Sequence, residues 1–373
     1  MEQRLGRFRK HVVFALVLAW ALLGAAACQR GGNVIVMKGD RPTVRGLKAL
    51  ELTGDLAHRR PFPPYNTGST GGRGRVFLVA LGADVANFAQ EVVDQREMWL
   101  RSGVSADQIV CYYTKPTSSG YKSDQAQFES LVRHLGDFYP ASPGLIAQHL
   151  GEAAHQSPDW IYVYLTGHGS APLSHRKRPS DLGSPAGTYV LQEFPELDDY
   201  SLASDTAEAR TVNLVMKLHA AQQGVDRSEL FLTPAVMHRW LRVFPASTRK
   251  IVVLQGCYSG GFLRRDPDFP AIGMKTLEQV ANLVAVAAAR GDRTSFGCDP
   301  GSSRTVFGDA WIKALSKQLD KGQETDWTAV YTEVREAVDR AEAAMNYPIT
   351  ARSRPALLIT PHLQQGEDVS HHN

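Results

Sequence analysis

The chain has 373 residues and a formal net charge of +3, from 41 basic and 38 acidic side chains. This length suffices for one large core, so one α/β domain with flanking segments is expected rather than two equal domains. The balanced charge and the lack of a dense Lys/Arg stripe exclude the composition typical of nucleic-acid-binding proteins.

Residues 1–28 have the pattern of a targeting segment. Four basic residues lie within the first ten, residues 12–23 are apolar, and small residues precede Cys28. The apolar part is short for a membrane span and is typical of a secretory signal peptide.

The end of this segment resembles the lipobox of bacterial lipoproteins, which implies that Cys28 is acylated and becomes the first residue of the mature chain. Gln29 is not the aspartate that retains lipoproteins at the inner membrane by enterobacterial sorting, so we expect an extracytoplasmic protein held at the outer membrane. Ala25 stands where the lipobox usually has leucine. An ordinary signal peptide or an uncleaved anchor is therefore the alternative.

Residues 29–74 are rich in Gly, Pro, Arg and Thr, which predicts a flexible tether between membrane and domain. A pro-segment is the alternative function for this stretch.

Strands and helices alternate over the predicted domain, residues 75–362. The apolar runs predict six strands, at residues 75–81, 109–113, 160–166, 250–254, 283–287 and 355–359. Helical spacing and start signals predict helices at residues 84–101, 142–155, 206–223, 233–243, 303–319 and 326–345. This alternation predicts a mainly parallel, roughly six-stranded sheet with helices on both faces. Residues 171–205 are irregular, and residues 363–373 are expected to be a disordered tail.

Two strand ends carry the chemistry. Residues 161–170 (IYVYLTGHGS) and 251–261 (IVVLQGCYSGG) each run from a buried strand into glycine and then a reactive side chain, His168 or Cys257. Ligands of open α/β sheets bind beyond the carboxyl ends of the strands. Neighbouring strands would therefore place an imidazole and a thiol on one rim, as a cysteine nucleophile requires.

The remaining cysteines do not suggest a metal site. Cys111 lies inside an apolar strand, and Cys298 follows the fifth strand. With Cys28 acylated, three thiols remain, and this odd number indicates one that is free and reactive. A bridge between Cys111 and Cys298 stays open. We find no zinc-ligand spacing and expect neither a metal nor an organic cofactor.

These motifs resemble the caspase–haemoglobinase class of cysteine peptidases. Residues 282–298 (NLVAVAAARGDRTSFGC) and 303–311 (SRTVFGDAW) are similar to the segment after the nucleophile in legumain, the asparaginyl endopeptidase, and its relatives. The resemblance extends from about residue 75 to residue 360. It implies a caspase/legumain-like fold and an endopeptidase that acts on protein or peptide substrates.

The resemblance also implies a mechanism. Cys257 attacks the peptide carbonyl as a thiolate, His168 protonates the leaving amine and later helps to activate water, and the N–H groups of Gly169 and Cys257 bind the oxyanion. A helix that begins near Ser259 would favour the thiolate through its dipole.

Substrate recognition is expected from three further positions. Gln255 stands where legumains have an acidic residue, while Ser295 and Asp309 match a serine and an aspartate of the family's pocket. One carboxylate with neutral amides favours an asparagine side chain narrowly over a basic one. Asn87 matches an asparagine that orients the catalytic histidine.

Three alternatives remain open. A serine hydrolase could use Ser259, although the Gly-x-Ser-x-Gly pattern is broken by Cys257. A lipoprotein of this fold could bind peptides without cleaving them. A transpeptidase or transamidase could resolve the thioester with an amine in place of water.

Overall fold

The computed structural model describes Phe62 and residues 73–81, 86–113, 125–135, 138–141, 143–169, 189–190, 231–264, 276–298 and 302–361. The predicted signal segment with Cys28, nearly all of the predicted tether, the predicted helix 206–223 and the tail lie outside these residues.

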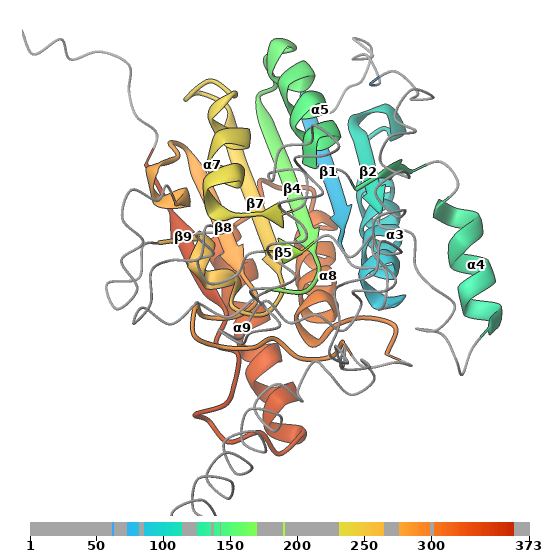
Figure 1. Cartoon of the computed structure of the whole chain (residues 1–373), viewed down its shortest axis with the longest axis vertical. Helices are drawn as coiled ribbons and strands as arrows, with labels where there is room; N and C mark the ends of the chain where they lie inside the picture. The colour runs from blue at the N-terminus through green and yellow to red at the C-terminus, as the bar shows by residue number, and fades with distance from the viewer. Residues whose placement is uncertain are drawn as a thin grey trace, which may run out of the picture.

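A seven-stranded sheet forms the centre of the domain (Figure 1). Its strand order is β3-β2-β1-β4-β7-β8-β9, with bounds β1 Gly74–Ala80, β2 Ile109–Tyr113, β3 Tyr139–Pro140, β4 Trp160–Thr166, β7 Arg249–Gln255, β8 Leu283–Ala287 and β9 Ala356–Ile359. All neighbours are parallel except β8 and β9. The six predicted strands are all present, which confirms the mainly parallel sheet. The two-residue edge strand β3 is too short to leave a pattern in the sequence.

Helices cover both faces, as predicted. One face packs against α3 (Ala86–Arg101), α4 (Gln125–Leu135), α8 (Val306–Leu319) and α9 (Trp327–Ala344). The other face packs against α5 (Pro143–His155) and α7 (Pro234–Arg242). The sequence analysis missed α4.

The strands are apolar on both sides because both faces are covered. In β1, Val76 and Leu78 point into one core cluster, whereas Phe77 and Val79 point into the other. Alternate side chains of a strand face opposite ways, so a strand in a two-layered core becomes a continuous apolar run.

Short elements complete the described chain. The strands β5 (Tyr189–Val190) and β6 (Phe231–Leu232) form an antiparallel pair outside the main sheet. Three 3₁₀ helices occur, η3 at Ala106–Gln108, η6 at Ser259–Phe262 and η7 at Leu277–Gln279. Within the described part of the chain, none of the helices combines the length and apolarity needed to cross a bilayer.

Side chains at three helix starts accept the backbone N–H groups that a helix leaves unpaired. Thr233 accepts from Val236 at the start of α7, Thr305 accepts from Gly308 in α8, and Asp326 accepts from Thr328 and Ala329 in α9. The Thr-Pro sequence predicted the start of α7 correctly.

Trp311 is the largest fully buried side chain and joins α8 to the sheet and to α9. Its indole N–H donates to Tyr162 Oη at 2.8 Å, and its ring stacks 6.4 Å from that of Trp327. We expect Trp311→Ala to lower the free energy of unfolding by about 3–5 kcal/mol, because it leaves a large cavity. Urea unfolding would measure this, with the exposed Ile349→Ala as control, for which a change below about 0.5 kcal/mol is expected. A loss below about 1 kcal/mol for Trp311→Ala would contradict this packing.

Candidate active site

The pairing of β4 with β7 brings the two predicted catalytic residues to the same level of the sheet. Thr166 pairs with Gln255 at the end of the ladder, and the partners are 89 residues apart along the chain. His168 and Cys257 lie two residues beyond these partners and have the same separation. The ladder continues past the strands, because Gly167 N–H donates to Gln255 O at 3.2 Å. The two loops therefore leave the sheet side by side.

Gly169 lies directly against the backbone of Cys257. A Cβ atom on Gly169 would lie 1.8 Å from Cys257 O and 3.2 Å from Cys257 N. No side chain fits into that space, so glycine is required for the close approach of the two loops. The structure thus brings His168, Gly169 and Cys257 together on one rim, as the sequence predicts. Their catalytic and oxyanion roles stay predictions.

The thiol of Cys257 faces the loop that follows β8. Its Sγ lies 3.6 Å from Ser295 O and 3.4 Å from Ser295 N, and both residues are buried. The Ser295 N–H is a donor that a thiolate at this position can accept. Ser295, predicted to line the substrate pocket, therefore contacts the nucleophile through its backbone, and its pocket role stays a prediction.

A helix begins at Ser259, as predicted, and it is a 3₁₀ helix. This four-residue helix, η6, follows Cys257, and Tyr258 before it has a left-handed φ of 58°. Gly260 N–H donates to Ala289 O at 2.8 Å, which ties this turn to the end of β8. A single 3₁₀ turn aligns fewer peptide dipoles than a long α-helix does. The expected dipole support for the thiolate stays a prediction.

Ser259 does not have the surroundings of a nucleophile. Its side chain is fully buried, and its Oγ accepts the N–H of Ala289 at 3.3 Å. The hydroxyl therefore fixes the turn after Cys257, and its position disfavours the serine-hydrolase alternative.

His168 packs against the first turn of α3. Its ring lies 5.0 Å from that of Phe88, edge to face, and the side chain is half-buried. The neighbouring Asn87 is fully buried, and its Nδ2 donates to Gly297 O at 2.5 Å. Asn87 thus ties α3 to the loop after β8, and its predicted role in orienting His168 stays a prediction.

Gln255 is fully buried, although the sequence suggests a substrate-binding role. Its Oε1 accepts from Thr166 Oγ1 at 2.8 Å and from Gly167 N at 3.3 Å. In this conformation the amide oxygen joins β7 to β4 below the rim. A direct contact of Gln255 with substrate stays a prediction and requires the side chain to turn.

Asp309 lies in the first turn of α8, and two cations engage its carboxylate. Arg304 Nη1 is 3.2 Å from Oδ1, and Lys313 Nζ is 2.6 Å from Oδ2. A carboxylate that is already ion-paired attracts a cationic or polar ligand group less strongly than an unpaired carboxylate. The pocket role of Asp309 stays a prediction, and it requires a substrate to compete with these ion pairs.

The sequence analysis missed a buried acid below the rim, Glu91 of α3. Its carboxyl group contacts Tyr164 and Thr166 of β4 and Thr305 at the start of α8. Burial raises the pKa of Glu91 above its ordinary value, and hydrogen bonds from Thr305, Thr166 and Tyr164 oppose this shift. Its position between Phe88 and Val92 on the apolar face of the predicted helix was the signal that could have revealed it.

The other two described cysteines differ from Cys257 in their surroundings. Cys111 and Cys298 are both buried, and no disulfide joins them. Burial raises the pKa of Cys111 to about 12. A thiol of this kind, in the middle of β2, is unsuited to act as a nucleophile at neutral pH. The described residues contain no group of three or more His, Cys, Asp or Glu side chains that could hold a metal ion.

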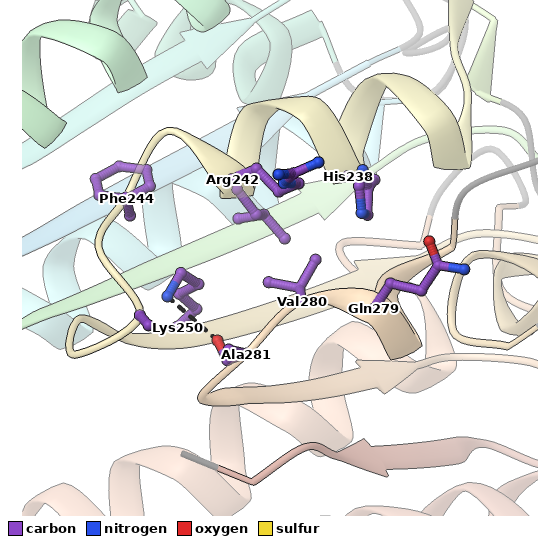
Figure 2. A pocket seen from close by; sticks show the side chains of 9 residues that line it. His238, Arg242, Phe244, Lys250, Gln279, Val280 and Ala281 are labelled. Carbon is purple, nitrogen blue, oxygen red and sulfur yellow. Dashed lines mark hydrogen bonds between the residues drawn. The ribbon is translucent and has the colours of Figure 1, made fainter. Parts of the chain in front are cut away.

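A pocket of about 450 Å³ lies at the opposite end of the strands, near Lys250 at the start of β7 (Figure 2). A seven-residue strand spans roughly 20 Å, which separates this pocket from Cys257. Lys250 Nζ donates to Pro245 O, Thr248 O and Ala281 O at 2.8, 2.8 and 3.2 Å. These carbonyls occupy all three N–H donors of the ammonium group. Lys250 therefore holds backbone in place and leaves no donor for a ligand.

A family model matches part of the chain. Residues 211–355 match the Peptidase C13 family, the legumain family, which confirms the predicted resemblance over a segment that contains Cys257 but not His168. No curated protein matches the chain.

Solved structures show only distant likeness. A crystal structure of a Geobacter sulfurreducens protein is 11% identical with a TM-score of 0.44, covering 79% of this chain and 95% of its own. Caspase-1 from Spodoptera frugiperda is 12% identical with a TM-score of 0.41, covering 81% and 94%. The fold is therefore established by the strand order and pairing of the sheet.

Because Gly169 lies directly against Cys257, we predict that a single methyl group added at Gly169 lowers the stability of the protein. We expect Gly169→Ala to lower the free energy of unfolding by about 1–3 kcal/mol, because the methyl group must push the two loops apart. The matched control is Gly151→Ala in α5, where a Cβ meets nothing within 4 Å and the helix gains up to about 1 kcal/mol. Urea unfolding of both variants measures the difference. Equal stability of the two variants would show that the loops are not in close contact.

Proposed function

We propose, from the match of residues 211–355 to the Peptidase C13 family, that this chain is a cysteine endopeptidase with Cys257 as nucleophile and His168 as acid/base. The observation that carries the proposal is the register of β4 and β7. The family match covers Cys257 but not His168, and the register of β4 and β7, which puts their two loops at the same level of the sheet, supports the pairing of the two residues.

The proposed reaction proceeds through a thioester. The Cys257 thiolate attacks the carbonyl carbon of the scissile bond and forms a C–S bond, and the carbonyl oxygen takes up the negative charge. The N–H groups of Gly169 and Cys257 stabilise this oxyanion. His168 gives a proton to the nitrogen of the leaving amine as the C–N bond breaks.

Hydrolysis then regenerates the enzyme. Water attacks the thioester carbonyl while His168 accepts one of its protons. The C–S bond breaks, the new carboxylic acid departs, and Cys257 returns to the thiolate. His168 is partly exposed, which suits both proton transfers.

Within this proposal the residue preceding the cleaved bond is asparagine. Ser295 supports the assignment of the pocket next to the thiol, because its backbone lies within 3.6 Å of Cys257 Sγ. Gln255 and Asp309 complete the pocket only if the Gln255 amide turns and the Asp309 ion pairs open. A basic side chain would be favoured if Asp309 alone is released.

Cleavage of a peptide library, varied at the residue before the scissile bond, tests the proposed activity. We expect the full chain to cleave preferentially after asparagine, and Cys257→Ala to lose at least about a thousandfold in kcat/KM, because the thioester cannot form. Cys111→Ala is the matched control, since it removes an equally buried thiol far along the sheet.

Activity that survives in Cys257→Ala would contradict the cysteine mechanism. If the wild type cleaves no peptide, even after limited proteolysis, peptide binding without cleavage would be favoured. Products that gain the mass of an added amine would favour the transferase.

We also propose that a lipid on Cys28 anchors the chain, outside the cytoplasm, to a bacterial membrane, with the outer membrane favoured. The apolar run before the Gly-Ala-Ala-Ala-Cys sequence supports this proposal. Cys28→Ser is expected to move the protein from the membrane fraction to the soluble extracytoplasmic fraction, because the acylated thiol is lost. Immunoblotting of fractionated cells would measure the shift, with Cys298→Ser as the control. Unchanged membrane association of Cys28→Ser would favour the uncleaved apolar anchor instead.

A further inference from the structure

Glu91 lies in a buried network of oxygen atoms between α3, β4 and the start of α8. Its Oε2 is 2.7 Å from both Tyr164 Oη and Thr166 Oγ1, and its Oε1 is 2.6 Å from Thr305 Oγ1. The fourth short oxygen–oxygen contact joins Thr166 Oγ1 to Gln255 Oε1 at 2.8 Å. All five side chains are buried without access to solvent.

The number of protons in this network decides the charge of Glu91. Each of the four oxygen–oxygen contacts needs one proton between its two atoms. The hydroxyl groups of Tyr164, Thr166 and Thr305 supply three protons, and the Gln255 oxygen supplies none. A proton on Glu91 Oε2 that is donated to Thr166 Oγ1 provides the fourth. Thr166 can then donate its own proton to Gln255.

The orientation of the Gln255 amide agrees with this count. Its Oε1 also lies 3.3 Å from Gly167 N, whose N–H is shared between this oxygen and the backbone O of Gln255 at 3.2 Å. Turning the amide would remove the need for a fourth proton, but it would place an NH₂ group against this N–H. The hydrogen bond from Thr166 to Gln255 is therefore favoured, and with it the proton on Glu91.

The burial of Glu91 also favours its protonated form. An ionised carboxylate without a charged partner is costly in a buried site. The shift of the Glu91 pKa has burial as its largest cause, and the opposing contributions all come from hydrogen bonds. On the elements packed against Glu91, Arg304 forms ion pairs with Asp94 of α3 and Asp309 of α8.

We propose that Glu91 is protonated at neutral pH and acts as a positioning residue that holds the ends of β4 and β7 together. Its proton fixes Thr166, Thr166 fixes Gln255, and His168 and Cys257 follow these two residues by two positions each. The carboxyl group also receives the N–H of Thr305 at 2.7 Å, which ties the start of α8 to the same network. The catalytic part of this inference rests on the proposed peptidase function, whereas the protonation state does not.

The space around Glu91 shows how closely the network is built. A Cβ on Gly308 would lie 2.1 Å from Glu91 Oε1, so the backbone of α8 lies directly against the carboxyl group. Replacement by glutamine keeps the shape and supplies two N–H donors where the protonated acid supplies one O–H donor. Glu91→Gln is therefore a neutral mimic, whereas Glu91→Ala removes the whole link.

The pH dependence of stability tests the protonation state without any assay of activity. If the folded state holds the proton, Glu91 adds to the free energy of unfolding of wild type relative to Glu91→Gln. This added stability is fully present below the unfolded pKa of glutamate, about 4.3, and is lost as pH rises through the folded pKa. The difference in Tm between the two proteins is expected to fall by about 3–5 °C for each pH unit in that interval. A difference that grows as pH rises above about 4 would show an ionised Glu91 and overturn the proposal.

Peptide cleavage tests the positioning role. We expect Glu91→Gln to stay within about threefold of wild type in kcat/KM, and Glu91→Ala to lose at least about tenfold, mainly in kcat, because the strand ends are no longer held. The control is Gln95→Ala, one turn further along α3, which removes an equally buried side chain that accepts from Tyr162 Oη at 2.8 Å. It should lower Tm and leave kcat unchanged.

The outcomes separate this inference from the proposed function. Equal losses in Glu91→Gln and Glu91→Ala would overturn the positioning role. A wild type without peptidase activity would contradict the proposed function, and the stability measurements would still decide the protonation state. If Glu91→Ala does not fold, the comparison of Glu91→Gln with wild type carries both tests.

Discussion

The parallel register of β4 and β7 is the constraint on which the rest of the site depends. Seven residue pairs fix this register, and the end of the ladder is closed by the bridge between Thr166 and Gln255. A slip of one residue would turn every side chain to the opposite face and would also separate His168 from Cys257. Two reactive side chains on separate loops lie near each other because the paired strands β4 and β7 fix where the two loops begin.

The support for this rim lies in a polar layer inside an apolar core. Along β4, Tyr162 and Tyr164 donate to Gln95 and Glu91, which lie one helical turn apart on α3. Buried polar groups of this kind are stable only when each finds its partner, and they then fix one arrangement of helix and strand. The reactive groups follow the carboxyl ends of the strands, while Glu91, Thr166 and Gln255, which we propose hold these ends together, are buried one layer below.

The sequence predicted the strands, most helices and the pairing of His168 with Cys257, because these depend on local patterns. Long apolar runs identify strands buried on both faces, and parallel strands end at one edge of the sheet. The partners of Glu91 and Gln255 could not be predicted, because they depend on which turn of α3 meets β4. The helix expected near Ser259 is a single 3₁₀ turn, in which Ser259 and Gly260 bond to Ala289 beyond the end of β8. The polar helix α4 carries too weak an apolar face to be recognised.

The three described cysteines offer a direct test of the account, because Cys111, Cys257 and Cys298 are 4%, 5% and 6% exposed. Burial alone would make their thiols equally unreactive. The decisive measurement is the rate of iodoacetamide alkylation at each cysteine of the folded protein, followed by mass spectrometry in wild type and His168→Ala. We predict that Cys257 is alkylated at least about tenfold faster than the other two at neutral pH, and that His168→Ala reduces this advantage. Equal rates at the three cysteines, or selective alkylation of Cys257 that is unchanged in His168→Ala, would contradict the claim that the strand register creates a reactive Cys257–His168 pair.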